Sequence, residues 1–218
     1  MYETFIFDID GTLIDTEEAV LGSLQKMLKI HFNWSIPRQD LKFVLGIPGA
    51  VSLPQLGITD IELGNQLWNK YMTDFRQTIH VFDGIQQLLS TLKERSITTG
   101  VVTSKTYQEY QNDFVPFGLA NDLNYIVCAD DTELHKPNPD PLLKFLQISE
   151  AIAESSIYIG DTIYDYECAR DAGMDFGLAL WGCKNPDCIP AKYKFEHPKD
   201  IFSLINKSSV VNSTNGER

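Results

Sequence analysis

The chain has 218 residues, enough for one substantial core or for a main domain with a smaller one attached. Its 43% hydrophobic and 22% charged residues are typical of soluble globular proteins and argue against disorder over most of its length. The formal net charge of -12 disfavours binding to nucleic acids and to anionic membranes, and a phosphorylated substrate would need cations close to its binding site.

The sequence predicts a cytoplasmic protein. No stretch approaches the roughly 18 apolar residues of a membrane-spanning helix. Glu3, Asp8 and Asp10 occupy the region where a secretion signal has a basic start and a long apolar run, and four cysteines without a targeting segment indicate a reducing compartment. Cys183 and Cys188 are close enough to suggest a metal pair, but no second pair or histidine cluster accompanies them, so we interpret them as ordinary thiols.

In chain order, the first predicted element is a buried strand at residues 4–9, a short β-rich apolar run. Similar runs predict strands at residues 98–103, 125–128, 156–159 and 176–181. Between them, apolar residues recur with helical spacing at Ile85, Leu88, Leu89 and Leu92, at Tyr107, Tyr110 and Phe114, and at Leu142, Leu143 and Leu146. This alternation predicts an α/β fold with a Rossmann-like doubly wound parallel sheet, covered by helices on both faces.

Residues 16–80 interrupt the alternation, because every clear pattern there is helical. The first helix carries apolar residues from position 19 to position 28, with Thr16 as its predicted N-cap. A second helix is predicted from Pro37 through Leu45. Asp60 is predicted to cap a third, whose apolar side carries Leu63, Leu67, Trp68, Tyr71, Met72 and Phe75.

An all-helical insert after the first strand predicts a cap domain that covers the core. We expect hinges near Asp15 and near residues 82–84. The expected boundaries are a core at residues 1–15 and 81–207, a cap at residues 16–80 and a flexible polar tail at residues 208–218. The alternative is that these helices belong to one compact domain.

Asp8 and Asp10 follow the first predicted strand, at the edge where α/β sheets characteristically bind ligands. Gly11 allows a tight turn, and Thr12 offers a hydroxyl and a backbone N–H close by. Two carboxylates this close repel each other, so a cation is needed to keep both ionised, whereas a proton on one provides a general acid. An ordinary Asp-rich turn is the alternative.

Three further polar features follow later strands in the same way. Small hydroxyl residues end the strand at 98–103, a lysine lies in a loop stiffened by two prolines, and two carboxylates lie near the start of a helix after the strand at 156–159. These are Thr103 and Ser104, Lys136, and Asp161 and Asp165. Alone, each has an ordinary explanation, such as a solvated lysine or a helix cap. Four in this order are unlikely to coincide by chance.

Together the four features resemble the haloacid dehalogenase superfamily. Residues 7–13, Thr103, Lys136 and residues 160–165 match its four ordered motifs, and the resemblance extends from residue 4 to about residue 180. The helical insert resembles the C1-type cap of the phosphoglycolate phosphatase and β-phosphoglucomutase branch. Asp10 separates the chain from the dehalogenase branch, which lacks a carboxylate there, and this favours phosphoryl transfer.

The resemblance implies a role for each of these residues. Asp8 is the expected nucleophile, which attacks phosphorus and forms an aspartyl phosphate. Asp10 is expected to protonate the departing oxygen and later to accept a proton from the hydrolytic water. Thr103 and Lys136 complete the expected catalytic set. The expected phosphate-binding residues are Thr12, Thr103, Ser104 and Lys136.

The resemblance also implies Mg²⁺ as the cofactor, which suits a set of hard oxygen ligands. The expected metal-binding residues are Asp8, Asp10 through its backbone carbonyl, Asp161, and Asp165 directly or through water.

The sequence therefore predicts a Mg²⁺-dependent, phosphoglycolate phosphatase-like enzyme that hydrolyses small phosphomonoesters. The expected partner is a small phosphorylated metabolite, with no nucleic acid and no membrane, and the chain is expected to be a monomer or a homodimer. The alternatives are a β-phosphoglucomutase-type sugar phosphate mutase, a pyrophosphatase and, less favoured, a phospho-receiver or an inactive binding protein.

Residues 45–54, a predicted loop, contain no Lys or Arg. We therefore expect a neutral or modestly charged leaving group, unless Arg38, Lys42 or Arg76 supplies a cation.

Overall fold

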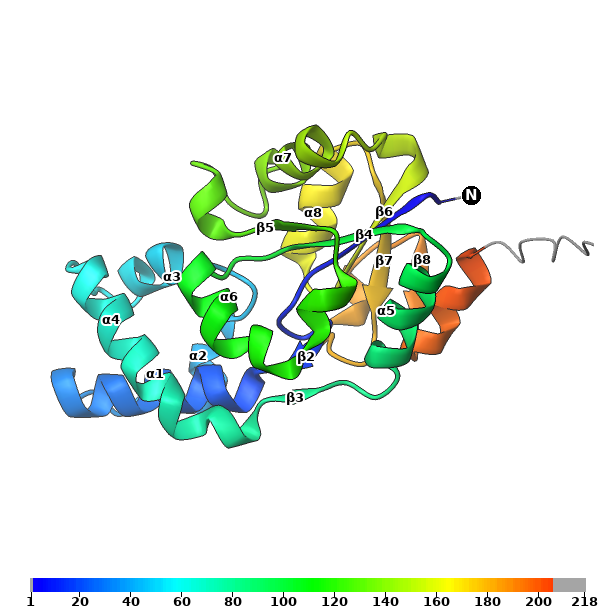
Figure 1. Cartoon of the computed structure of the whole chain (residues 1–218). Coiled ribbons are helices and arrows are strands. Elements are labelled where there is room, and N and C mark those ends of the chain that lie inside the picture. Colours follow the sequence, from blue (N-terminus) through cyan, green and yellow to red (C-terminus); the bar gives the residue numbers. More distant parts are fainter. Residues whose placement is uncertain (1, 206–218) are drawn as a thin grey trace, which may run out of the picture.

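The structure is a computed structural model that describes residues 2–205. It consists of an α/β core and a group of helices on one side of it (Figure 1). The tail predicted at residues 208–218 lies outside the described residues. Among residues 2–205, no helix is long and apolar enough to cross a membrane.

The core is built on one six-stranded parallel sheet with the strand order β5-β4-β1-β6-β7-β8. The strands are β1 (Thr4–Phe7), β4 (Thr98–Val102), β5 (Tyr125–Val127), β6 (Ser156–Gly160), β7 (Asp175–Ala179) and β8 (Tyr193–Phe195). Five of them were predicted by buried apolar runs, and the predicted fold class is confirmed. The short edge strand β8 was not predicted, because Lys194 interrupts its apolar run, whereas the equally short β5 is apolar throughout.

Helices cover both faces of this sheet: α5 (Ile85–Glu94), α6 (Tyr107–Asp113), α7 (Asp140–Ser149) and α8 (Ile163–Asp171). Because successive side chains of a strand point to opposite faces, Phe5 and Phe7 belong to one hydrophobic cluster and Ile6 to another. In α7, Leu142 is buried but Leu143 is exposed, contrary to the predicted stripe. Adjacent helical residues lie about 100° apart, so both cannot face the sheet.

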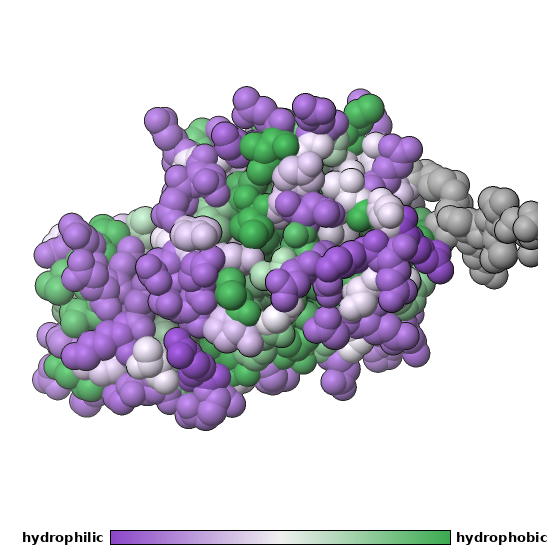
Figure 2. Space-filling view, viewed as in Figure 1, coloured by the Kyte–Doolittle hydropathy of each residue, from purple (hydrophilic) through white to green (hydrophobic). Residues whose placement is uncertain are grey.

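Short 3₁₀ helices connect several of the core elements. They are η3 (Val115–Phe117), η4 (Leu119–Asp122), η5 (Ala129–Asp131), η6 (Ala153–Ser155), η7 (Pro186–Cys188) and η8 (Pro198–Leu204). On the face shown in Figure 2, the surface is mostly hydrophilic, with apolar side chains visible in patches between the polar ones.

The insert contains the helices α1 (Glu17–Phe32), α2 (Arg38–Leu41), η1 (Lys42–Val44), α3 (Gly49–Gln55), α4 (Ile61–Met72) and η2 (Thr73–Thr78). Helix α1 packs against α4, where Trp68 and Met72 are buried. Asp60 caps α4 as predicted, by accepting a hydrogen bond from the backbone N–H of Leu63 at 3.1 Å. The Leu63 side chain itself is exposed, so it does not belong to the buried stripe.

Several predictions about the insert are wrong in detail. The second predicted helix, from Pro37 through Leu45, is one α-helical turn followed by the 3₁₀ helix η1. The predicted loop at residues 45–54 contains most of α3, which its glycine and prolines had concealed. Thr16 precedes α1 but its hydroxyl does not cap it. The carboxylate of Asp15 instead accepts a hydrogen bond from the first backbone N–H, at Glu17, at 3.1 Å.

Two short strands connect the insert to the core. They are β2 (Ile14–Asp15) and β3 (His80–Val81), which pair antiparallel and lie where the chain passes between the two parts (Figure 1). The expectation that residues 16–80 contain no strand is therefore wrong at His80. Two-residue strands carry no periodicity, so only their pairing defines them.

Candidate active site

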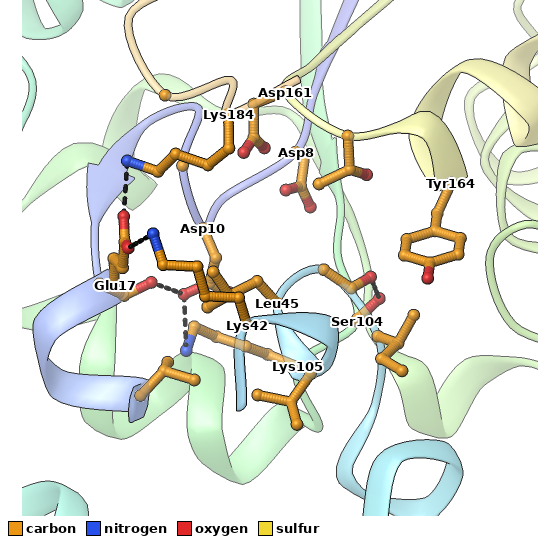
Figure 3. A pocket seen from close by; sticks show the side chains of 18 of the residues that line it. Asp8, Asp10, Glu17, Lys42, Leu45, Ser104, Lys105, Asp161, Tyr164 and Lys184 are labelled. Carbon is orange, nitrogen blue, oxygen red and sulfur yellow. Dashed lines mark hydrogen bonds and ion pairs between the residues drawn. The ribbon is translucent and has the colours of Figure 1, made fainter. Parts of the chain in front are cut away.

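A cavity of about 710 Å³ lies between the carboxyl edge of the sheet and the helical insert at residues 16–80, which we call the cap (Figure 3). Four of the predicted site residues line it, namely Asp8, Asp10, Ser104 and Asp161. Cap residues form much of the opposite wall, among them Val20, Lys42, Phe43, Leu45, Trp68 and Met72. The other predicted site residues are Thr12, Thr103, Lys136 and Asp165, and all four are buried.

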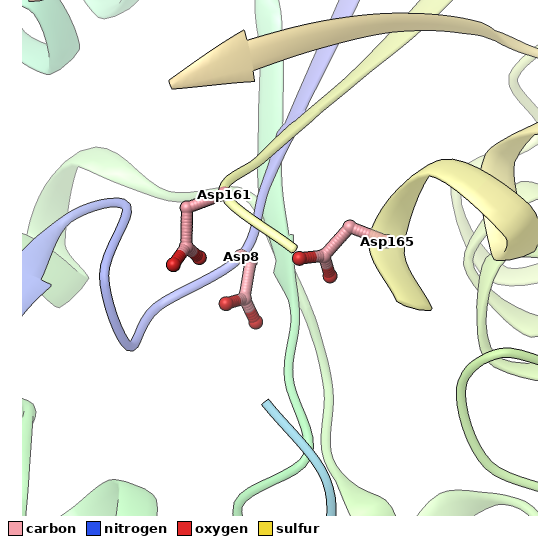
Figure 4. Close-up of side chains that lie close together, drawn as sticks. All are labelled: Asp8, Asp161 and Asp165. Atoms are coloured by element: carbon pink, nitrogen blue, oxygen red, sulfur yellow. The ribbon is translucent and has the colours of Figure 1, made fainter. Parts of the chain in front are cut away.

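Three carboxylates form a cluster at the sheet edge (Figure 4). Asp8 follows β1, Asp161 follows β6, and Asp165 lies in the first turn of α8; one oxygen of each lies within 4.8 Å of the others. Burial raises the pKa of Asp8, and the nearby charges of Asp165 and Asp10 raise it further, although Lys136 acts in the opposite direction. Burial and the charges of Asp165 and Asp8 also raise the pKa of Asp161 well above its ordinary value. The cluster therefore favours a bound cation or proton.

Lys136 lies inside this cluster. Its ammonium donates to Asp8 Oδ1 and to Asp165 Oδ1, each at 2.7 Å, and to the Tyr158 hydroxyl at 3.1 Å. Burial alone would lower the pKa of Lys136, but the charges and hydrogen bonds of Asp165 and Asp8 raise it, so the ammonium stays charged. Tyr158 was not predicted as a site residue, because a tyrosine within a strand is most simply read as core.

Asp165 has hydrogen-bond partners within the protein at both of its oxygens. Oδ1 accepts from Lys136 and from the Tyr158 hydroxyl, and Oδ2 accepts from the backbone N–H of Thr162 at 3.0 Å and from the Thr162 hydroxyl. Thr162 and Asp165 form a capping box at the start of α8. In this arrangement Asp165 fixes Lys136, and its predicted contact with a metal ion stays a prediction.

Asp10 is held by a lysine that sequence reasoning missed. Asp10 Oδ1 accepts from the Thr16 hydroxyl at 2.7 Å and lies 3.1 Å from the ammonium of Lys105. The same ammonium donates to Asp113 at 3.3 Å, and the side chains of Lys105 and Asp113 are both buried. The signal for Lys105 was its place directly after Thr103 and Ser104 at a strand end.

The three predicted phosphate-binding hydroxyls have different partners. The Thr12 hydroxyl is fully buried and donates to Asp161 Oδ1 at 3.3 Å. The Thr103 hydroxyl accepts from the backbone N–H of Lys105 at 3.2 Å. Ser104 lines the cavity and donates to the carbonyl of Gly46 in the cap, at 3.0 Å.

Gly11 lets the backbone approach Asp161 closely, and Gly182 lets it approach the backbone of Gly11. Gly11 has a φ of +82°, and a Cβ added there would lie 2.3 Å from Asp161 Oδ2. A Cβ on Gly182 would lie 1.7 Å from the carbonyl oxygen of Gly11. Both positions therefore require glycine for space, and Gly11 also for its backbone conformation.

Lys42 is one of the three cap cations, with Arg38 and Arg76, that could overturn the expectation of a neutral leaving group. It lies in η1 and lines the cavity, so the reason for expecting a neutral leaving group no longer holds. Cys183 and Cys188 also line the cavity, and both are free thiols.

The sequence model of the haloacid dehalogenase-like hydrolases matches residues 5–179. The "Putative pyrophosphatase PpaX" of Caldanaerobacter subterraneus subsp. tengcongensis is 29% identical over 201 residues, which cover 92% of this chain and 91% of the relative. The "N-acetylmuramic acid 6-phosphate phosphatase" of Pseudomonas aeruginosa is 27% identical, with 93% of this chain and 94% of the relative covered.

Solved structures agree with this comparison. The crystal structure of a "putative phosphoglycolate phosphatase" from Lactobacillus plantarum has a TM-score of 0.85 and 28% identity, covering 94% of this chain and 99% of that one. The matched range spans the positions of all the predicted site residues, from Asp8 to Asp165. The chain therefore belongs to the haloacid dehalogenase-like hydrolase family, as one of its phosphatase-type enzymes.

Proposed function

We propose that this chain is a Mg²⁺-dependent phosphatase that hydrolyses small phosphomonoesters through an aspartyl phosphate on Asp8. The observation that carries the proposal is the environment of Asp8. Its carboxylate lies just after β1, one of the two central strands, one oxygen is held by Lys136, and the residue lines the cavity under the cap. A fixed carboxylate at the base of a cavity, with an acid two residues away, is suited to nucleophilic catalysis.

The carboxylate cluster fits a divalent metal ion. Among residues 2–205, a single ammonium, that of Lys136, lies at hydrogen-bond distance from these three carboxylates, so the cluster carries excess negative charge when all three are ionised. Oxygen donors are the ligands that Mg²⁺ prefers. Asp8 and Asp161 would hold the ion together with the backbone carbonyl of Asp10, and the bound ion would offset the charge of the phosphoryl group.

The side chains divide the reaction between them. Asp8 attacks phosphorus, so that an oxygen–phosphorus bond forms while the bond to the leaving oxygen breaks. Asp10 donates its proton to that oxygen, then accepts a proton from the water that attacks the phosphoenzyme, which releases phosphate and restores Asp8. Thr16 and Lys105 both contact Oδ1 of Asp10, which leaves Oδ2 for proton transfer.

Pyrophosphate hydrolysis is the second candidate, because a relative named for pyrophosphatase activity is similar over most of both chains. The chemistry at Asp8 is the same, with phosphate as the leaving group. A sugar phosphate mutase, which would use the same chemistry at Asp8, remains an alternative because the cap provides a cation, Lys42.

The first test is phosphate release from a broad panel of phosphomonoesters and pyrophosphate, with Asp8→Asn as the blank. Asp8→Asn should lose essentially all turnover because the nucleophile has no substitute. Asp10→Asn should stay folded but turn over about 10²- to 10⁴-fold more slowly, because only water can then act as the acid.

Treatment with EDTA should abolish activity until Mg²⁺ is restored.

Wild-type turnover in Asp8→Asn protein would show that the proposed nucleophile is wrong.

The lifetime of the phosphoenzyme distinguishes a phosphatase from a phospho-receiver and from an inactive binding protein. A phospho-receiver keeps its phosphate for long periods, an inactive binding protein never acquires it, and a phosphatase with Asp10 intact loses it quickly.

A further inference from the structure

Two lysines from opposite walls of the cavity converge on one carboxylate, that of Glu17. Glu17 is the first residue of α1; its Oε2 lies 2.5 Å from the ammonium of Lys184, and its Oε1 lies 3.3 Å from the ammonium of Lys42. Lys42 belongs to the cap helix η1, whereas Lys184 belongs to the core, beyond β7 (Figure 3). All three residues line the same cavity as Asp8.

These two cations are distinct from those that serve the reacting phosphoryl group. Lys136 is held at Asp8 and Asp165, and Lys105 is held between Asp10 and Asp113. Lys42 and Lys184 contact neither pair, and Glu17 is the partner that they share. They are therefore placed to offset a negative charge away from the phosphorus atom.

An ordinary surface salt bridge is the simplest alternative explanation. The neighbouring pair formed by Glu18 and Arg38 fits that description, because it lies on the cap and neither residue lines the cavity. Glu17 differs because its ion pairs lie inside the cavity and join the cap to the core. The two lysine side chains are about half exposed, so these pairs add little to stability and an incoming anion can displace Glu17 at small cost.

We propose that Lys42 and Lys184 form a subsite for a second anionic group on the substrate, and that Glu17 occupies this subsite when no substrate is bound. The substrate class is then a small phosphorylated molecule whose leaving group carries a carboxylate or a further phosphate. This inference rests on the proposed phosphatase function. It explains how a protein with a net charge of -12 attracts such an anion, since two ammonium groups lie at the place where that charge is needed.

The test compares two substrates that differ by one charge, 2-phosphoglycolate and its amide, 2-phosphoglycolamide. In Lys42→Gln and Lys184→Gln proteins, the ratio of kcat/KM for the acid to that for the amide should fall about tenfold each, as expected for the loss of one charge-assisted hydrogen bond. Glu17→Gln should raise the ratio, because the competing carboxylate is gone. Glu18→Gln is the matched control and should leave the ratio unchanged.

Pyrophosphate is the second probe and identifies the anionic group. A larger lysine dependence for pyrophosphate than for 2-phosphoglycolate assigns the subsite to phosphate, and the reverse assigns it to carboxylate. A ratio of acid to amide that stays the same in both lysine variants, while the wild type hydrolyses both substrates, overturns the subsite.

Binding measured by calorimetry on Asp8→Asn protein with Mg²⁺ separates this inference from the proposed function, because it needs no turnover. There, both lysine substitutions should weaken binding of 2-phosphoglycolate but not of the amide. If wild-type protein releases phosphate from neither substrate nor from any other member of the panel, yet this lysine-dependent binding is present, the phosphatase proposal fails and the subsite is supported. If binding of the acid and of the amide is affected equally, the subsite is overturned.

Discussion

The hydroxyl of Thr12 is fully buried and donates to Asp161, one of the two side chains proposed to bind Mg²⁺. A partner that orients a metal ligand commonly changes metal affinity by 10- to 100-fold when it is removed. Thr12→Val keeps the shape of the side chain and removes only the donor. We therefore expect the Mg²⁺ concentration for half-maximal activity to rise about tenfold, with little change in KM for the substrate at saturating Mg²⁺.

Titrations of activity against Mg²⁺ and against substrate distinguish this role from the phosphate contact predicted for Thr12. If KM for the substrate rises while the Mg²⁺ requirement is unchanged, the hydroxyl binds phosphate and the positioning role is wrong. Thermal unfolding of the variant checks that the site is still formed.

The carboxylates at the first and last motifs were predictable because each follows a buried apolar strand, and the ends of parallel strands meet at one edge. Asp8, Asp10 and Asp161 accordingly line one cavity. The partners of these residues were not predictable. Lys105 contacts Asp10 and Tyr158 contacts Asp165 only after distant segments pack together, and a lysine or a tyrosine has many ordinary roles on its own.

At the level of elements, the turn after β1 depends on Gly11. Gly11→Ala places a methyl group within 2.3 Å of Asp161 and forces a residue with a side chain into a φ of +82°. Gly118→Ala is the matched control, because its φ is +78° but nothing lies within 4 Å of the added Cβ. Both variants should lose about 1 kcal/mol of stability from the backbone conformation.

Only Gly11→Ala should also lose activity, by more than tenfold, with a raised Mg²⁺ requirement, because the added methyl group displaces Asp161. Chemical denaturation and activity assays on the two variants measure these effects separately. Equal activity in the two variants would mean that the turn tolerates the methyl group and that activity does not depend on the observed position of Asp161.

The elements themselves were predictable where a pattern is long. The five main strands and α5 follow from apolar runs and stripes of at least four residues. Helix α3 was missed because Pro48, Gly49 and Pro54 resemble a loop, although proline is compatible with the start of a helix and tertiary packing overrides weak local preference. Strands β2 and β3 were missed because two residues cannot show a period.

For the molecule as a whole, the buried carboxylates link stability to pH and to the metal ion. In the metal-free protein the pKa values of Asp8 and Asp161 are raised, chiefly by burial, so the folded state holds protons that the unfolded state releases. The stability contributed by these groups is therefore fully present below their ordinary pKa of 3.8 and is lost as the pH rises through the raised folded-state values.

Under the proposed function, Mg²⁺ would bind the deprotonated carboxylates and relieve their repulsion, so its effect should grow over the same range of pH. We expect the rise in Tm on adding Mg²⁺ to be larger at pH 8 than at pH 5. Asp161→Asn protein, which lacks one of the titrating carboxylates, should show a smaller rise and a weaker dependence on pH. Thermal unfolding with and without Mg²⁺ at the two pH values measures this directly. An equal rise at both values, or a larger one at pH 5, would mean that the metal ion does not bind at the carboxylates that bind the protons.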